Sequence, residues 1–383
     1  MIHTVKKPLA SSGLNASGNG FSETTHISED DLLAVQLSSS EWTEIASLLP
    51  VDNSLFFKWG GEIGEGADLT FSFVGSDFVD YDENYYDVNG DGSISGELAA
   101  SVTFGQQTPG AQPIDYSDEE KAVIRDIFDD WSNASGLNFT EVADTFSSYG
   151  EIRLTKLDFD TWEAFDPLYQ GAAGFAYHPL GGDGYFYEPI GGDIFIDDKH
   201  SPGDGYFEHV VSHEIGHALG LAHPFEGYIP FGSQTSSYSA AKTIMTYNDE
   251  ASLYAVSPMP IDISAMQFLY GGSSTANQGN TVYTLEEELL NSSKSNYALE
   301  GNGVYGDGTR VSIIDVGGVD IIKIAGEFDQ GVSINLQPGS WSNVKDNQEH
   351  LFSEAAAGSL TATFSGGPVI AASKNQIDTY GQI

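Results

Sequence analysis

The clearest periodic pattern of apolar residues lies between Ser117 and Gly136. Apolar side chains recur there at steps of three and four residues, the spacing of one helix face. This stripe consists of Val123, Ile124, Ile127, Phe128 and Trp131. Ser117 and Glu120 have the spacing of a capping box, and Gly136 supplies a stop. The pattern therefore predicts an amphipathic helix that packs against a core.

Short apolar runs separated by Gly and acidic residues surround this helix and predict strands. The runs are LFFKWG, LTFSFVG, LNFTEV, EIRLTKL, GAAGFAYHPL and GGDIFIDD. Two further helices are expected, one starting near Glu208 and one spanning Ile261 to Leu269. Beyond residue 272 the pattern changes to short alternating runs such as RVSIIDV and LTATFSG. We therefore place a domain boundary near 272 and predict an all-β domain over residues 273–383.

Composition excludes several classes of protein. The 383 residues include 56 acidic and 14 basic residues, giving a net charge of −42. Such a surface repels phosphates, so no nucleic-acid partner is expected. No apolar run reaches the ~20 residues needed to span a membrane. Cysteine is absent, which excludes disulfides, thiolate zinc sites and a catalytic cysteine.

The first residues differ from the rest of the chain. The stretch MIHTVKKPLASSGLNASGNG is rich in Ser, Gly and Asn, and no acidic residue precedes Glu23. It lacks the apolar segment of a secretory signal, so we expect no cleavable N-terminal Sec signal. We interpret residues 1–40 as a leader of the propeptide type. Residues 41–272 then form the main domain, with an acidic, Gly-rich insertion at 77–112.

The segment HEIGHALGLAHP contains three of the nine histidines. His213 and His217 are four residues apart, so on a helix both rings lie on one face and reach a single ion. A catalytic zinc site uses three protein ligands and a water. Glu214 would project beside the metal, where it can act as general base toward the bound water.

Gly220 determines whether a third histidine can join the site. Glycine adopts the left-handed conformation readily, so the helix can end there and return His223 to the metal. Pro224 then hinders the helix from resuming. The alternative is three surface histidines on an ordinary helix, which the full HExxHxxGxxH pattern disfavours.

The pattern is the zinc signature of the metzincin endopeptidases, and the chain resembles them. In TIMTYN, Met245 resembles the methionine that forms an apolar floor beneath the metal of that family. Tyr247 resembles the switchable ligand of the serralysin and astacin branches, which stabilises the oxyanion. The serralysin branch of peptidase family M10 is most similar, because PMPIDISAMQFLYG and IIDVGGVDIIKIAG also resemble its segments.

This resemblance implies an α+β catalytic domain with a mixed, mostly parallel twisted sheet, an active-site helix and a backing helix. The C-terminal domain would resemble the start of a serralysin β-roll or sandwich. The implied activity is that of a secreted, monomeric zinc endopeptidase that cleaves protein substrates with broad specificity. An extended substrate would pair with an edge strand made of Gly174, Phe175, Ala176 and Tyr177.

Calcium sites are also implied by the resemblance. DVGGVD matches a calcium loop of the family at Asp315, Gly317 and Asp320, and the facing ligands would be Asn277, Gly279 and Thr281. DVNGDGSI resembles the first half of an EF-hand loop, with Asp87, Asn89 and Asp91 as ligands. Its twelfth position is Leu98, so the bidentate glutamate is missing, and an acidic turn is the alternative.

Other features leave alternatives open. The sequence contains none of the GGxGxDxUx repeats with which serralysins continue, so it is either a truncated form or a member that lacks the calcium roll, and the C-terminal export signal of the family is in doubt. A leader group such as Asp30 or Asp31 could block the zinc of a zymogen, and nothing singles one out.

A second zinc site is conceivable from His178, His200 and His209 with Asp193 or Asp197, although no ligand spacing is recognisable. A catalytically weak or zymogen-form protein that binds peptides is the alternative function.

Overall fold

The structure is a computed structural model, and it describes most of the chain in sixteen segments. These are residues 24–28, 31–32, 39–50, 56–76, 113–145, 148–160, 171–179, 191–203, 205–234, 236–248, 254–286, 309–325, 334–335, 339–343, 349–355 and 360–365. The predicted insertion and its calcium ligands Asp87, Asn89 and Asp91 lie outside these residues. Asp30, one of the leader groups considered as a zinc block, lies outside them as well.

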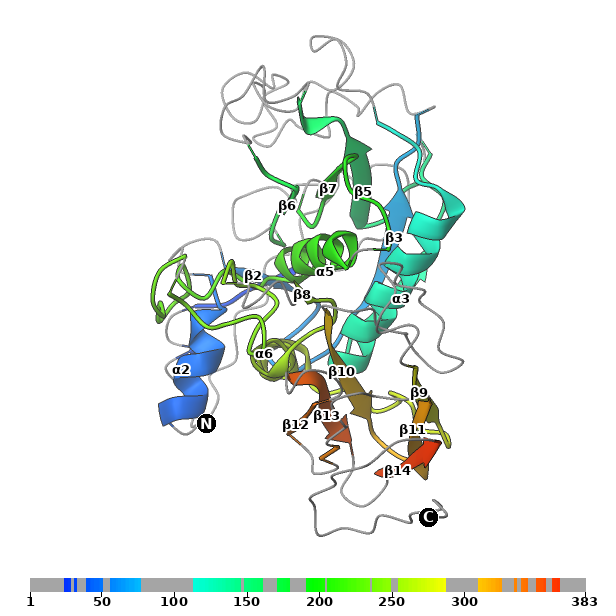
Figure 1. Ribbon diagram of the computed structural model, residues 1–383. Helices are drawn as coiled ribbons and strands as arrows, with labels where there is room; N and C mark the ends of the chain where they lie inside the picture. The colour runs from blue at the N-terminus through cyan, green and yellow to red at the C-terminus, as the bar shows by residue number, and fades with distance from the viewer. Residues whose placement is uncertain are drawn as a thin grey trace, which may run out of the picture.

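A five-stranded sheet forms the upper part of the molecule (Figure 1). In spatial order its strands are β4 (Asn138–Glu141), β3 (Asp68–Phe73), β5 (Ile152–Leu157), β7 (Ile194–Asp197) and β6 (Gly174–Ala176). All neighbouring pairs are parallel except β6 with β7, which is antiparallel. The expectation of a mixed, mostly parallel sheet is therefore confirmed, with the predicted substrate strand at its edge.

The central strands β5 and β7 are buried along their whole length. Strands covered on both faces are expected to be continuously apolar, yet β5 carries Arg153 and Lys156. Arg153 pairs with Asp144 at 2.7 Å, and Lys156 pairs with Glu120 at 2.9 Å. Each buried cation thus has an acidic partner, whose attraction offsets part of the cost of removing the charge from water.

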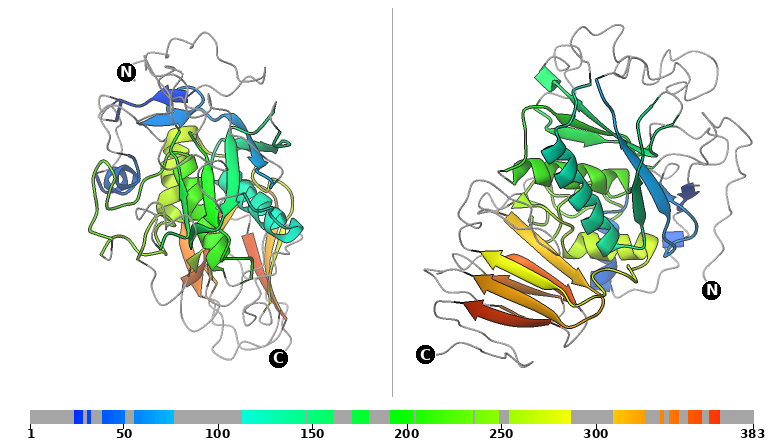
Figure 2. Two further views of the ribbon diagram at one scale, coloured as in Figure 1. Left: turned by 90° about the horizontal axis from the view of Figure 1, so that it is seen from above. Right: turned by 90° about the vertical axis from the view of Figure 1, so that its right-hand side faces the viewer.

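Helix α3 (Asp118–Ala134) covers one face of this sheet (Figure 2). Ser117 and Glu120 form the predicted capping box. The apolar stripe is buried, and Phe128 stacks on Phe71 of β3 with ring centroids 4.1 Å apart. Gly136 has a different role from the one predicted, because it has no left-handed backbone and a side chain there would clash with the Tyr270 carbonyl.

Two more helices complete the core. Helix α5 (Tyr206–Ala218) begins two residues before the predicted start and packs against α3, β6 and β7. Helix α6 (Pro260–Tyr270) matches the predicted third helix and contacts α3. The largest hydrophobic cluster joins all three helices to the sheet, with Trp59, Trp131 and Phe207 fully buried in it.

Residues before the main domain also take part in the fold, which the sequence pattern did not predict. Strand β1 (Thr24–His26) pairs with β2 (Phe57–Trp59) in antiparallel orientation. Helix α2 (Ser39–Ser47) packs on α6, and its Trp42 contacts Phe268 edge to face at 5.9 Å. The predicted leader boundary at residue 40 therefore falls inside a helix, and the position of that boundary stays a prediction.

After Gly272, every regular element among the described residues is a strand. These are β9 (Val282–Glu286), β10 (Thr309–Asp315), β11 (Asp320–Ala325), β12 (Ser340–Asn343), β13 (Glu349–Ala355) and β14 (Leu360–Ser365). They form two small sheets. One has the strand order β12–β13–β10–β8 and so includes β8 (Tyr254–Ala255), and the other has the order β14–β11–β9. Figures 1 and 2 show these strands together at the end of the molecule away from the five-stranded sheet. Within the described residues, no helix is both long and apolar enough to cross a bilayer.

Candidate active site

Helix α5 presents two of the predicted zinc ligands from a buried position. His213 and His217 are exposed by only 5% and 9%, and each ring is held by a main-chain carbonyl. The Nδ1 atom of His213 lies 2.8 Å from Ile244 O, and that of His217 lies 2.7 Å from Leu221 O. Since a carbonyl oxygen only accepts hydrogen bonds, Nδ1 carries the proton in both rings, and each Nε2 presents a lone pair.

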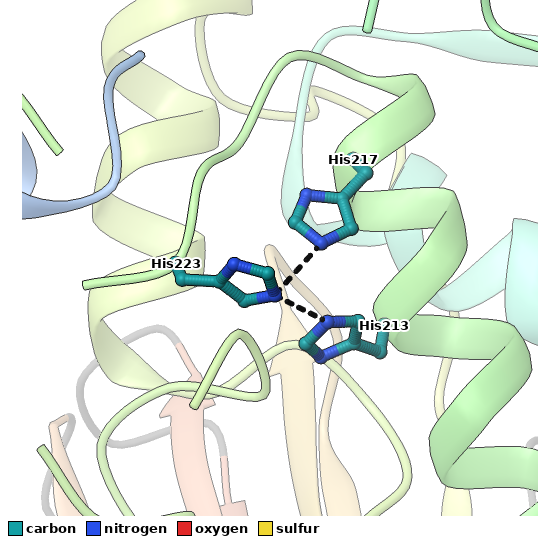
Figure 3. A group of neighbouring side chains, drawn as sticks. All are labelled: His213, His217 and His223. Atoms are coloured by element: carbon teal, nitrogen blue, oxygen red, sulfur yellow. Dashed lines mark hydrogen bonds between the residues drawn. The ribbon is translucent and has the colours of Figure 1, made fainter. Parts of the chain in front are cut away.

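The third histidine comes from the chain segment beyond the helix. Gly220 has a φ of 100°, in the left-handed region that favours glycine, and the chain turns there. Leu221 N donates to Gly216 O at 2.9 Å and helps to close the end of the helix. His223 is thereby directed back toward α5. Its Nε2 lies 3.2 Å from Nε2 of both His213 and His217, as Figure 3 shows.

These three residues fit a zinc ion. The His223 Nδ1 atom lies 2.7 Å from the Glu226 carboxylate, so it too carries a proton, and in the neutral ring that a metal requires Nε2 presents a lone pair. Three lone pairs that face one another repel unless a cation lies between them. Burial lowers the pKa of His213 and His217 well below the usual value, which keeps both rings neutral as a metal requires. Within the described segments, this is the one cluster of three or more potential ligand side chains.

Glu214 belongs to helix α5, and its side chain lies against strand β6. Its side chain is buried, and no described group forms a hydrogen bond with Oε2. Burial raises the pKa of Glu214 to about 8. A Cβ on Gly174 of β6 would lie 2.9 Å from Glu214 Cγ, so the strand main chain runs directly beside this carboxyl group. Glu214 therefore has an oxygen available for a molecule placed between the histidines and the strand.

Met245 and Tyr247 lie on the same turn, but the side chain of Met245 is buried and that of Tyr247 is exposed. Met245 is fully buried, and a Cβ on Gly216 of α5 would lie 2.5 Å from its sulfur, so the thioether packs tightly under the helix. Tyr247 is 52% exposed, and its ring centroid lies 4.4 Å from that of His223. Burial of its phenol and the nearby Glu214 raise the pKa of Tyr247, so its hydroxyl group is protonated at neutral pH.

Asp262 holds this turn in place, and the sequence analysis did not identify it. Its carboxylate accepts hydrogen bonds from Thr243 Oγ1 at 2.5 Å, Ile244 N at 2.7 Å and Met259 N at 2.8 Å. The Ile244 carbonyl in turn binds the His213 ring. Burial raises the pKa of Asp262 to about 7, and the three donors oppose that rise. The available signal was an acidic residue in the first turn of an otherwise apolar helix.

Comparison with known proteins agrees with this geometry. Residues 101–255 match the model of the Peptidase_M10 family, described as matrixin. Serralysin from Proteus mirabilis is 30% identical over 262 residues, which cover 62% of this chain and 50% of the relative. The chain is therefore similar to the serralysins and to the M10 metalloproteases. Serralysin B from Dickeya chrysanthemi is 29% identical over 314 residues, covering 75% of this chain and 55% of the relative.

A third relative gives the same picture. Metalloprotease AprA from Pseudomonas entomophila is 28% identical over 287 residues, covering 67% of this chain and 54% of AprA. The serralysin-like chain thus matches about half the length of each of these relatives. The family resemblance expected from the zinc signature is therefore confirmed.

Strand β6 of the serralysin-like chain is half buried along its three residues. Its Phe175 stacks on Phe195 of β7 with centroids 4.6 Å apart. Only β7 pairs with β6, so the other edge of β6 has no strand beside it in the described part of the chain. Tyr177 follows the strand, and its main-chain N–H and carbonyl both bond to the segment just before β7.

His178, His200 and His209, which all lie in described segments, do not gather into a second metal site. Nε2 of His178 contacts Leu221 O at 3.0 Å, and Nδ1 of His209 contacts Ala255 O at 2.8 Å. The ring of His200 packs on Tyr206 with centroids 4.7 Å apart. In the described segments, no cluster of potential ligands forms around them. Asp31 likewise lies in a local turn, where its carboxylate accepts from Ser28 N at 2.9 Å.

The predicted calcium residues lie in two facing turns. Thr281 N donates to Asp320 Oδ1 at 3.0 Å, and Gly317 N donates to Asp315 Oδ1 at 3.0 Å. A side chain on Gly318 would clash with the Gly279 carbonyl, so the two turns are in contact. Asn277, whose φ is 47°, donates from its side chain to Ile314 O at 2.8 Å. The structure brings these segments together, and calcium binding there stays a prediction.

Proposed function

We propose that this protein is a zinc-dependent endopeptidase whose metal is held by His213, His217 and His223. The observation that carries the proposal is the convergence of three Nε2 atoms from rings that each have a hydrogen-bond acceptor at Nδ1. When bound there, zinc would polarise the scissile carbonyl and increase the acidity of a water molecule.

Glu214 performs the proton transfers in this proposal. Its free Oε2 accepts a proton from the attacking water, and the same carboxyl group delivers that proton to the amine that leaves. A zinc ion held by the neighbouring histidines would favour the ionised carboxylate, which is the form that a general base requires. Tyr247, whose phenol is protonated and half exposed, donates a hydrogen bond to the oxyanion that develops on the scissile carbonyl.

The substrate binds as an extended chain along the open edge of β6. Main-chain hydrogen bonds along the open edge of Gly174, Phe175 and Ala176 would align it beside Glu214, whereas the N–H and carbonyl of Tyr177 already bond to the segment before β7. Such bonds are independent of side-chain identity, so we propose broad specificity toward protein substrates. Met245 supports the site from below, and Gly220 allows His223 to reach it.

Further proposals concern the rest of the protein. We propose that the strands after residue 272 form a separate C-terminal β domain stabilised by calcium at Asp315, Gly317 and Asp320, with Asn277, Gly279 and Thr281 facing them. We also propose that the protein is secreted and monomeric, and that residues before about 40 act as a leader. The names of the relatives and the negative charge of the chain are compatible with these proposals.

A casein-cleavage assay tests the proposed function. The purified protein should cleave casein, lose activity with 1,10-phenanthroline and regain it when zinc is added. Glu214→Ala should still bind zinc but lower kcat by at least about 100-fold, because it removes the general base. Cleavage that survives this substitution would refute the mechanism. Zinc binding without any cleavage by the wild-type protein would instead indicate a peptide-binding module.

A further inference from the structure

His223 differs from the other two ligands in how its ring is oriented. His213 and His217 project from helix α5, and each bonds to a main-chain carbonyl that is part of the folded core. His223 lies beyond the helix, and its Nδ1 bonds to a side chain, the carboxylate of Glu226, at 2.7 Å. The orientation of the third ligand therefore depends on a residue that can be changed without altering the main chain.

The segment that carries His223 and Glu226 is attached to the start of the domain. Ala222 N donates to Leu48 O at 2.7 Å, and Tyr228 N donates to Leu49 O at 2.7 Å. A side chain on Gly227 would clash with the Ser47 carbonyl, so the main chain next to Glu226 is fixed against the end of α2. The Glu226 carboxylate is thus presented to His223 from a fixed main-chain position.

Aromatic rings restrict His223 from other directions. Phe225 stacks on the imidazole with a centroid distance of 5.0 Å and an interplanar angle of 5°. Tyr247 lies 4.4 Å away at an angle of 54°. These contacts limit the tilt of the ring, but they do not distinguish the two ring nitrogens. A hydrogen-bond acceptor at Nδ1 favours the tautomer that keeps the proton on that nitrogen.

We propose that Glu226 is a positioning residue that fixes the tautomer and orientation of His223 and thereby sets the zinc affinity of the site. The proposal rests on the proposed zinc-dependent function. A carboxylate at Nδ1 keeps the proton there, leaves the Nε2 lone pair for the metal and increases the basicity of the ring. The alternative is an ordinary surface ion pair, since the Glu226 side chain is 57% exposed and such pairs contribute little.

Zinc affinity separates these possibilities, and it can be measured by competition with a chromophoric chelator. We expect Glu226→Ala to weaken zinc binding by about 10- to 100-fold. Glu226→Gln keeps a carbonyl oxygen that accepts from Nδ1 and should retain most of the affinity. Glu119→Gln is the matched control, because it removes one negative charge from an exposed position on α3 and should leave the affinity unchanged.

A second readout uses the metal-free protein. Ring ¹⁵N chemical shifts should show His223 with its proton at Nδ1 in the wild type and in Glu226→Gln, and a mixture of tautomers in Glu226→Ala. His213 and His217 serve as internal controls, because their carbonyl partners are unchanged. These shifts also establish that the variant is folded.

The outcomes are distinct. Equal zinc affinity for Glu226→Ala and Glu119→Gln, with wild-type zinc binding intact, overturns the positioning role and leaves the proposed function standing. An unchanged His223 tautomer in Glu226→Ala overturns it as well. Wild-type protein that binds no zinc in the same titration overturns both the positioning role and the proposed function.

Discussion

Replacing Asp262 with alanine tests whether the turn beneath the metal site is held by a single carboxylate. This side chain is fully buried, and it accepts hydrogen bonds from Thr243 Oγ1, Ile244 N and Met259 N. Its removal leaves three donors in the core without that acceptor. Each unsatisfied donor costs about 1–3 kcal/mol, so partial relaxation gives an expected loss of about 3–5 kcal/mol in the free energy of unfolding.

The same change should weaken the metal site. The Ile244 carbonyl receives the Nδ1–H of His213, so movement of this turn displaces the acceptor that orients a ligand. We therefore expect zinc affinity to fall by about 10-fold, the lower end of what outer-shell partners contribute. Asp262→Asn should be intermediate, because its amide keeps one accepting oxygen and places N–H groups against the donors.

Urea unfolding in the presence of chelator measures the change in the free energy of unfolding without any contribution from bound metal. The experiment is done at pH 8, above the Asp262 pKa of about 7, so that the carboxylate is ionised. Ser264→Ala is the control, since it lies on the same helix and removes one hydrogen bond, to Pro260 O at 2.9 Å. A loss below about 1 kcal/mol for Asp262→Ala would show that the turn does not depend on this carboxylate.

Two further predictions concern pH and the oxyanion. Burial lowers the pKa of Lys58 to about 8 from 10.5, so the unfolded chain binds more protons between these values and stability should rise with pH there. Over this pH interval the free energy of unfolding should rise by about 3 kcal/mol at most. In urea unfolding, Lys58→Met should lack this rise. Parallel pH curves for the two proteins would contradict the prediction. Tyr247→Phe should lower kcat by about 100- to 1000-fold with little change in KM, because its hydroxyl acts only in the transition state. A change confined to KM in casein or peptide kinetics would assign Tyr247 to substrate binding instead.

The sequence predicts those parts of the site that depend on short-range geometry. The spacing of His213 and His217 is a property of one helix, and the turn at Gly220 needs only a residue that accepts a φ of 100°. Strand and helix positions are also local, so most of the predicted runs coincide with strands and the capping box at Ser117 is present. The antiparallel pairing of β6 follows from topology, and no pattern within the strand indicates it.

The parts that the sequence analysis missed depend on contacts between distant segments. Asp262 supports a turn some twenty residues earlier in the chain, and Leu48 and Leu49 hold the segment that carries the third histidine. Gly136 was interpreted as a helix stop, yet the constraint on it comes from the Tyr270 carbonyl of another helix. In each case the residue type is ordinary, and only its partner in space gives it a role.

The predicted leader boundary shows how contacts between distant segments bear on the function. A boundary near residue 40 is reasonable from composition, but α2 begins at Ser39 and the chain after it bonds to both sides of His223 through Ala222 and Tyr228. Removal of residues well beyond 40 would therefore release the segment that presents the third ligand and Glu226. Processing that keeps α2 intact would preserve the proposed zinc site, whereas a cut after Leu49 would separate His223 from its support. The metal site and the start of the domain are thus one structural unit, although more than 170 residues separate them in the sequence.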